Sequence, residues 1–212
     1  MHSHDLKPQD LLARAFHHDP YISWAEPDGE RRPRTMSRVF GGMLNYAKTC
    51  GGHLFEPGVG SVHWRDGAAA DMGPLSVATS GTWRVALVAP PAVWYRLAAH
   101  EGASMARVQP FLGKSSVYLC TMGIEPTLAG QGHGSRLLSR ALDAMTRRWR
   151  TCVLRTEQPK NVPFYLRNGF SQVDEQVVPE SGLRSGSSRA RSRRSGPERP
   201  HRRAACRRAS GA

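Results

Sequence analysis

The segment EPTLAGQGHGSRLL, residues 125–138, carries glycine at every second position from Gly130 to Gly134 and then continues into residues that favour a helix. Glycine is the weakest helix former after proline, so this placement needs a specific reason. The first turn of a helix leaves backbone N–H groups unpaired and carries partial positive charge, which makes it an anion site. Glycines keep that site clear of side chains and adopt backbone angles that other residues avoid. The segment therefore predicts a loop that binds a phosphate-bearing ligand, in particular a pyrophosphate.

The composition of the chain limits what kind of protein surrounds this loop. Its 212 residues are 39% hydrophobic and 22% charged, which fits one globular domain. We expect a cytoplasmic protein without a membrane segment, because no apolar run approaches a bilayer span and residues 1–10 lack a signal-peptide pattern. The cysteines have no metal-ligand spacing, so we expect neither a metal site nor a disulfide framework. They are Cys50, Cys120, Cys152 and Cys206.

Hydrophobic periodicity predicts a mixed α/β sheet. The helices expected from apolar spacing cover residues 11–16, 34–47, 94–106, 135–148 and 163–167. The expected strands cover residues 117–124, 151–156 and 170–179, with two short strands around the Pro57-Gly58 turn. Residues 66–82 are rich in turn residues, and residues 83–91 fit either a strand or the start of a helix. In such a sheet a ligand binds where strands end and helices begin, which is where the glycine segment lies.

Other phosphate-binding motifs fit this segment less well. A Walker loop needs GxxxxGK[ST], but Val108 stands where the glycine before Gly113-Lys114-Ser115 is required. A dinucleotide fingerprint needs GxGxxG directly after a strand, whereas here the spacing is GxGxG and three residues intervene. Glu157 follows a second strand as the fingerprint requires, so this alternative stays open.

The sequence MGIEPTLAGQGHGSRLL resembles the coenzyme A motif of the GNAT superfamily of N-acetyltransferases, in which a strand and a proline precede a G-x-G-x-[GA] helix start. Downstream, LRTEQPKNVPFYLRNGF resembles the N-x-x-F-Y-x-x-x-G-F element of the same superfamily. The details YLCTMGIEP, NVPFY and VVPESG are similar to the puromycin N-acetyltransferase group. The resemblance is clear over residues 117–180 and weaker over residues 10–65. It implies a GNAT domain over residues 5–180.

The resemblance also implies a function and a set of site residues. Such a protein would transfer acetyl from acetyl-CoA to a primary amine of a small molecule by direct attack. Tyr165 matches the tyrosine that protonates the leaving thiolate, and it is protonated at pH 7 as an acid must be. By the same analogy, Asp19 and Trp24 would line the acceptor site. The residues expected to bind the cofactor are Met122, Gly123, Ile124, Gly130, Gln131, Gly132, His133, Gly134, Ser135 and Asn161.

Some positions depart from the superfamily pattern. Ala129 stands where Gln or Arg is usual, which removes one side chain near the phosphates and leaves the backbone cradle. Tyr118 stands where a carboxylate could act as general base, so the identity of the base stays open. The alternative function is a catalytically impaired GNAT-fold protein that binds CoA, with a basic tail contacting nucleic acid. We expect a monomer or a homodimer.

The C-terminal segment differs from the rest of the chain in composition and charge. Residues 181–212 contain ten arginines and one acidic residue, so they hold nine of the thirteen net positive charges. Without aromatic residues they cannot bury enough apolar surface to offset the entropy of ordering. We therefore expect residues 181–212 to be disordered and the sheet to lack its last strand, as a frameshift in a GC-rich gene would produce. Nucleic acid is expected as a partner only through this basic tail.

Overall fold

The computed structural model describes residues 7–191. Its α-helices are α1 (Pro8–Ala15), α2 (Pro20–Ala25), α3 (Arg32–Cys50), α4 (Pro74–Ser80), α5 (Pro91–Val108), α6 (His133–Met145) and α7 (Val162–Arg167). Its strands are β1 (Gly51–Glu56), β2 (Gly60–Asp66), β3 (Ser116–Ile124), β4 (Thr151–Thr156), β5 (Ser171–Val178) and β6 (Leu183–Arg191). Short 3₁₀ segments join these elements, among them η3 (Thr82–Leu87) and η6 (Pro159–Asn161).

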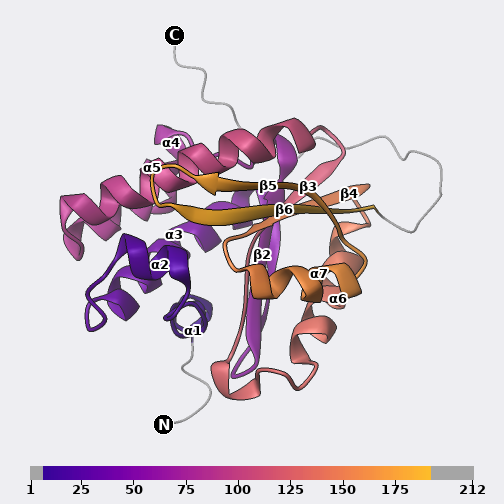
Figure 1. The fold of residues 1–212 in the computed structure, drawn as a ribbon, viewed down its shortest axis with the longest axis horizontal. Helices are drawn as coiled ribbons and strands as arrows, with labels where there is room; N and C mark the ends of the chain where they lie inside the picture. Colours follow the sequence, from indigo (N-terminus) through magenta and orange to yellow (C-terminus); the bar gives the residue numbers. More distant parts are fainter. Residues whose placement is uncertain (1–6, 192–212) are drawn as a thin grey trace.

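Within the described residues the strands form a six-stranded sheet in the order β1-β2-β3-β4-β6-β5. Only β3 and β4 run parallel to each other, and α6 makes the crossover between them. The other neighbouring strands are antiparallel. Figure 1 shows α6 and α7 on one side of strands β5 and β6 and the long helix α5 on the other. The predicted mixed α/β fold is confirmed.

Helices cover both faces of the sheet because alternate strand residues point to opposite faces. On one face α6 packs against β2, β3 and β4, and its buried residues recur at helical spacing, as expected for an amphipathic helix. These residues are Leu137, Leu138, Ala141 and Met145. On the other face Tyr118 and Val153 pack against Met105 and Val108 of α5. Full burial of one such leucine or valine contributes about 1.5–3 kcal/mol.

Local sequence patterns correctly predicted the position of most helices and strands. Helix α3 ends at Cys50, directly before Gly51, and the strands around Pro57-Gly58 form the hairpin β1–β2. Residues 83–91 lie mostly in η3, so the strand alternative is wrong there. Helices α2 and α4 were not expected. Asp19 caps α2 by accepting hydrogen bonds from two backbone N–H groups, with Pro20 in the first turn.

The expectation of a disordered segment from residue 181 is wrong for residues 183–191, which form β6. This strand lies between β4 and β5 and pairs with both, so the sheet does not lack its last strand. The reason is that backbone hydrogen bonds build a strand whatever its side chains, and the small residues here fit an interior position. Ser185, Ser187 and Ser188 are buried. The rest of the expected tail, residues 192–212, lies outside the described residues.

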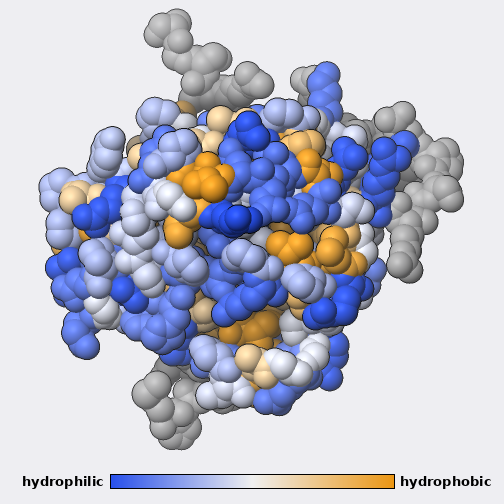
Figure 2. Space-filling model, in the orientation of Figure 1, coloured by the Kyte–Doolittle hydropathy of each residue, from blue (hydrophilic) through white to orange (hydrophobic). Residues whose placement is uncertain are grey.

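The face drawn in Figure 2 is mostly hydrophilic, with separate hydrophobic patches, one of them over α7. Leu166 of α7 is 47% exposed. Scattered apolar residues of this kind are ordinary on a protein surface. Among residues 7–191, none of the helices combines the length and the apolar character needed to span a bilayer.

Candidate active site

The parallel strands β3 and β4 part before either ends. Their pairing runs from Ser116 with Thr151 to Leu119 with Leu154 and then stops, although β3 continues to Ile124. Beyond that point β3 remains paired with β2 on its other side. The side of β3 that faces β4 is therefore open along residues 120–124, as expected for a strand that splays from its neighbour. A ligand with amide groups could bind this open edge like an added strand.

A β-bulge lies where the two strands part. His63 of β2 pairs with Thr121 and Trp64 with Leu119, so Cys120 is the extra residue on β3. A bulge bends its strand and increases the local twist. This bend accounts for the divergence of β3 from β4 directly after Leu119.

The glycine loop, residues 130–135, lies at the surface between β3 and α6. Gly130 and Gly132 have φ angles of 78° and 80°, in the left-handed region that favours glycine. Gly134 lies inside the helix, where a Cβ would come 3.4 Å from the ring of Phe164 and 3.7 Å from Ile124 Cγ1. The first two glycines thus serve the backbone conformation, and the third serves close packing between α6, α7 and the end of β3.

The backbone N–H groups of this loop are available to a ligand. Gly132 is the N-cap of α6, and the first hydrogen bond into the helix runs from Arg136 N–H to Gly132 O. Among the described residues, the N–H groups of Gly132, His133 and Gly134 donate to no backbone carbonyl. Unpaired N–H groups at a helix start, next to glycines, fit the pyrophosphate of a nucleotide-type ligand.

Side chains hold the loop from both sides. Asn168, at the end of α7, donates one hydrogen bond to Phe164 O at 2.8 Å and another to Ser135 Oγ at 3.3 Å. His133 Nδ1 lies 2.9 Å from a guanidinium nitrogen of Arg136. These contacts tie the loop to α7, so the two sequence elements that resemble the GNAT motifs are neighbours in space.

Tyr165 of α7 lies in the interior, between Phe164 and Phe170, with ring centroids 5.1 Å and 5.7 Å away. Its side chain is 8% exposed. Burial raises the pKa of Tyr165 above its ordinary value of 10.0, so its hydroxyl stays protonated at neutral pH. Asn161 ends η6 directly before α7, and its side chain donates to Thr156 Oγ1 at 3.4 Å.

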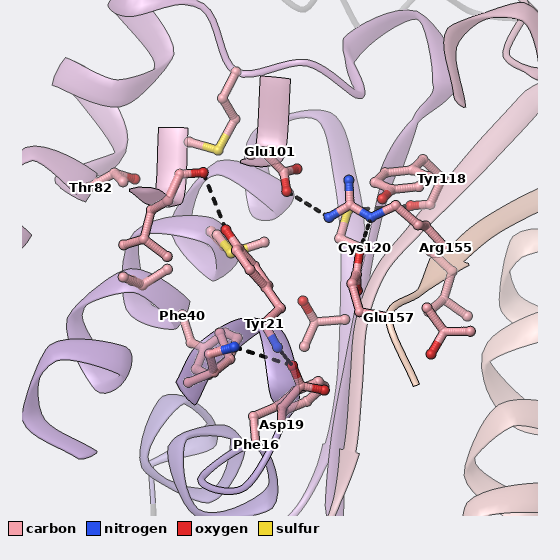
Figure 3. Close-up of a pocket in the computed structure, with 18 of the residues that line it drawn as sticks. Phe16, Asp19, Tyr21, Phe40, Thr82, Glu101, Tyr118, Cys120, Arg155 and Glu157 are labelled. Atoms are coloured by element: carbon pink, nitrogen blue, oxygen red, sulfur yellow. Dashed lines mark hydrogen bonds and ion pairs between the residues drawn. The ribbon is translucent and has the colours of Figure 1, made fainter. Parts of the chain in front are cut away.

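A cavity of about 340 Å³, here called the central pocket, opens between the parting strands and helices α2, α3 and α5. Met122, Asn161 and Tyr165 line it, so the open strand edge and the expected catalytic tyrosine meet there. In Figure 3, Arg155, Glu101 and Tyr118 lie toward one end of the pocket, and Asp19 and Phe16 lie toward the other. This volume suits a small molecule.

Ion pairs run along one wall of the central pocket (Figure 3). Arg155 Nη2 lies 2.7 Å from Glu101 Oε2, and Arg155 Nε lies 2.6 Å from Glu157 Oε1. Glu157 also faces His100 Nε2 at 3.4 Å. Burial works to raise the pKa of Glu157, but Arg155 and His100 outweigh it and lower this pKa to about 2. Glu157 is therefore ionised at neutral pH.

Asp19 is a second carboxylate of the central pocket, besides Glu157. It is 6% exposed and lines the central pocket. Gln158 Nε2 donates to Asp19 Oδ2 at 2.7 Å, which joins α2 to the segment between β4 and α7. Burial raises the pKa of Asp19, while the hydrogen bond from Gln158 works to lower it. A carboxyl group with a raised pKa is a suitable proton acceptor near neutral pH.

The structure divides the residues expected from the sequence into two groups. Met122, Asn161, Tyr165 and Asp19 line the central pocket, whereas the glycine loop lies at the surface outside it. Trp24 does not line the pocket and instead contacts His100, with ring centroids 5.9 Å apart. Within residues 7–191, no three His, Cys, Asp or Glu side chains gather in a group that could hold a metal ion.

Sequence reasoning missed several charged residues of the pocket. Arg65, Glu101 and Arg155 come from β2, α5 and β4 and form no local motif. Glu157 was considered only as the acid of a dinucleotide site. A charged residue within a run of strand residues, such as Arg155 in TCVLRT, is the one signal that could have drawn attention, because buried charges are rare without a partner.

Residues 92–172 match the family model described as an acetyltransferase (GNAT) domain. This segment runs from α5 to the first residues of β5, so it contains the parting strands, the glycine loop and Tyr165. It is less than half of the chain, and α1, α2, α3 and the hairpin β1–β2 lie outside it.

Comparison with solved structures extends the fold to nearly the whole chain. The structure of PH1933 from Pyrococcus horikoshii OT3 is similar to 89% of this chain and 92% of its own, with a TM-score of 0.52 and 13% identity. At such identity the likeness concerns the fold alone.

Two acetyltransferases are similar to a smaller part of the chain. Nourseothricin acetyltransferase matches 36% of this chain and 50% of its own, at 15% identity and a TM-score of 0.33. The ribosomal-protein-S18-alanine N-acetyltransferase from Escherichia coli matches 42% and 63%, at 15% identity and a TM-score of 0.35. This chain thus spans between half and two thirds of the length of these two proteins. The parting strands, the glycine loop and Tyr165 lie within a segment that matches the GNAT acetyltransferase domain, on a mixed α/β sheet.

Proposed function

We propose that the protein is an N-acetyltransferase that transfers the acetyl group of acetyl-CoA to a primary amine. The observation that carries this proposal is the parting of β3 from β4 after Leu119, which joins an open strand edge to the central pocket. The unpaired N–H groups of the glycine loop lie near the outer end of the same strand, and Tyr165 lines the pocket. The family match over residues 92–172 supports the same reaction.

The proposed co-substrate site consists mainly of backbone groups. Residues Met122, Gly123 and Ile124 on the open edge of β3 would hydrogen-bond the amide groups of the pantetheine arm, as an added strand does. The glycine loop, Gly130 to Ser135, would bind the pyrophosphate through its N–H groups. Asn161 would bind the pantetheine end near the pocket. Bound in this way, acetyl-CoA supplies the thioester whose carbonyl carbon the amine attacks.

Tyr165 would act as the general acid. Because burial raises its pKa, its hydroxyl carries a proton at neutral pH, which it would donate to the departing thiolate. Asp19 and Glu157 line the same pocket, and Gln158, which follows Glu157 in the chain, donates a hydrogen bond to Asp19. Asp19, whose pKa is raised, is the one proposed to take the proton that the amine must lose. General acid and base catalysis of this kind contributes about 10²–10⁴-fold to a rate.

The acceptor is proposed to be a small molecule. The central pocket is a cavity of about 340 Å³, which is the size of a small-ligand site. The resemblance of YLCTMGIEP and NVPFY to the puromycin N-acetyltransferase group supports the same view. We also propose a cytoplasmic location, because Cys120 and Cys152 form no disulfide and acetyl-CoA must be supplied.

Calorimetry with acetyl-CoA, followed by a thiol-release assay against a panel of primary amines, tests the proposal. We expect binding with a roughly micromolar dissociation constant and amine-dependent release of CoA thiol. Absence of acetyl-CoA binding would overturn the proposal. Binding without transfer to any amine would favour the non-catalytic alternative, in which the fold binds CoA only.

A further inference from the structure

The central pocket contains hydrogen-bond donors that have no acceptor. Within residues 7–191, three of the buried side-chain atoms without a hydrogen-bond partner belong to residues that line this pocket. They are Arg65 Nη1, Trp94 Nε1 and Arg155 Nη1. All three are donors only, because neither guanidinium nor indole nitrogen can accept a hydrogen bond. Buried polar groups are normally paired, so each of these atoms calls for an explanation.

Three acidic groups of the pocket are in the opposite situation, because each already has partners, and the fourth, Asp71, is exposed to solvent. Glu101 accepts from Arg155, and Glu157 accepts from Arg155 and Ser185. Asp19 accepts from Gln158 and from two backbone N–H groups. The pocket therefore lacks acceptors, not donors. A ligand that completes its hydrogen bonds must bring oxygen atoms.

Arg65 provides the clearest case. It is 2% exposed, and its Nε donates to Cys120 Sγ at 2.9 Å. The guanidinium carbon lies 5.4 Å from the ring centre of Tyr46 and 5.9 Å from that of Tyr118. Among the described residues no carboxylate lies within 4.0 Å of it. A charge buried without a counter-charge is costly unless something else compensates it.

Comparison with Arg32 shows that the fold can satisfy a buried arginine by itself. Arg32 is 9% exposed, and it donates three hydrogen bonds to the backbone carbonyls of Glu26, His17 and Pro27. Arg65 receives no such carbonyl in the described chain. The difference indicates that its acceptor comes from outside the polypeptide.

The second guanidinium lies near the first. Cys120, which accepts from Arg65, is the bulge residue of β3, and Arg155 is the first residue of β4 beyond the last pair with β3. Both guanidinium groups interact electrostatically with Glu101 and with Tyr118. Figure 3 shows Arg155 beside Glu101, Tyr118 and Cys120. Arg155 is paired with both Glu101 and Glu157, whereas Arg65 has no carboxylate within 4.0 Å among the described residues, so Arg65 is the guanidinium whose charge is left without a counter-ion.

We propose that the acceptor amine also carries an anionic oxygen group, which Arg65 and Arg155 bind. This inference rests on the proposed acetyl transfer and narrows its substrate class to amines with a carboxylate or a phosphate. Guanidinium groups bind both through charge-assisted hydrogen bonds. With the anion held at the arginine end, the amine of a zwitterionic substrate points toward Asp19, where Tyr165 also lines the pocket.

Matched pairs of amines test the inference. Phenylalanine is compared with phenylalaninamide, 4-aminobutyrate with butylamine, and 2-aminoethyl phosphate forms the phosphate arm. We expect kcat/KM to favour at least one acid over its uncharged partner by about tenfold or more, since a site built to pair a group rejects the analogue that lacks it. Whether the carboxylates or the phosphate show this preference identifies the group. Equal rates for charged and uncharged partners would mean that water fills the site, and the inference would be wrong.

Variants of Arg65 separate recognition from folding. Arg65→Met keeps the length and the apolar contacts of the side chain, and we expect it to abolish the preference for the acid while the melting temperature does not fall. Arg65→Lys keeps the charge and should retain part of the preference. Arg107→Met removes an exposed arginine that pairs with Asp174 away from the pocket and is the control. An equal loss for every amine in Arg65→Met would overturn the inference.

Binding of 4-aminobutyrate and butylamine, measured by calorimetry, separates this inference from the proposed function. We expect the wild-type protein to bind the acid at least tenfold more tightly than butylamine, and Arg65→Met to lose that difference. This measurement needs no acetyl transfer. If the wild-type protein binds the acid selectively but transfers nothing, only the proposed function fails. If it transfers acetyl groups without any selectivity, only this inference fails.

Discussion

The glycine loop and the central pocket differ in which part of the polypeptide meets the ligand. The loop presents the unpaired backbone N–H groups of the consecutive residues Gly132, His133 and Gly134. The pocket presents side chains from α2, α3, α4, α5, α7, β2, β3 and β4. A site made of consecutive backbone groups depends on a short run of sequence, whereas a site made of distant side chains depends on the whole fold.

The glycine loop and the central pocket should also differ in how they tolerate substitution. Most side chains of the loop can change without moving its N–H groups, provided that Gly130 and Gly132 keep their φ angles. In the pocket Arg155 is the partner of both Glu101 and Glu157, so one change in this group leaves another side chain unpaired. We therefore expect large effects in the pocket and effects restricted to glycines in the loop.

The largest expected effect is that of Tyr165→Phe. Removal of the hydroxyl takes away the proposed proton donor, so kcat should fall by about 100-fold or more. The dissociation constant for acetyl-CoA, measured by calorimetry, should stay the same. Tyr95→Phe on α5 is the control, because Tyr95 is 75% exposed and does not line the pocket. Undiminished turnover in Tyr165→Phe would remove this residue from its proposed role.

His63 should make the pocket side of the sheet sensitive to pH. It is fully buried on β2, and burial lowers its pKa from 6.5 to about 3. Below pH 6.5 the unfolded chain binds a proton that the folded chain does not, so stability falls by up to about 1.4 kcal/mol per pH unit. Denaturant unfolding between pH 6.5 and 4.5 measures this slope, and His63→Leu should flatten it.

Two carboxylates cannot produce the expected loss of stability in this pH window. Glu157, with a lowered pKa, loses its contribution only as pH falls below the 4.5 of the unfolded chain. Asp19, with a raised pKa, acts in the opposite sense, because its contribution increases as pH falls. His53→Gln, on the neighbouring strand and only half-buried, should change the slope much less. An unchanged slope in His63→Leu would exclude His63 as its source.

A smaller effect is expected for Gly132→Ala. Alanine at a φ of 80° costs about 1–2 kcal/mol, which favours another loop conformation and should weaken acetyl-CoA binding about tenfold. Gly182→Ala is the matched control, because Gly182 has a φ of 68° but lies in the turn between β5 and β6. It should show a similar loss of stability with unchanged affinity. Equal affinities in the two variants would mean that the loop does not bind the co-substrate.

The smallest effect is expected for His133→Ala. If the loop binds through backbone groups, removal of this imidazole should change the dissociation constant for acetyl-CoA less than about twofold. Only the contact with Arg136 is lost. A tenfold loss of affinity in calorimetry would show that the loop also binds through its side chains.

The sequence predicted the elements whose signal is local. Each of these signals lies within a short stretch of sequence. They are the glycines at the start of α6, the apolar run of β3 and the helical spacing of Leu138, Leu142 and Met145. Helix α2 carried a local signal that could have been read, since Asp19-Pro20 places a capping residue and a proline at a helix start.

The rest could not be predicted because it depends on contacts between distant residues. Arg65 and Arg155 are ninety positions apart and meet only after β2, β3 and β4 pair. Strand β6 was missed for a different reason. Apolar content was taken as the requirement for a strand, whereas this one is held by backbone pairing with β4 and β5.

The serine-rich interior of β6 has a consequence for how long the pocket keeps its charges in place. This strand contributes only Ala190 to the main apolar cluster, so β5 and β6 should open locally at lower free energy than β2 and β3, with faster amide hydrogen exchange. Within that hairpin, Ser185 of β6 contacts Glu157, and Ser181 of the turn contacts His100. Each transient opening of β5 and β6 would admit solvent to Glu157 and His100. The least stable strands of the sheet would thus control how long these side chains stay shielded from water.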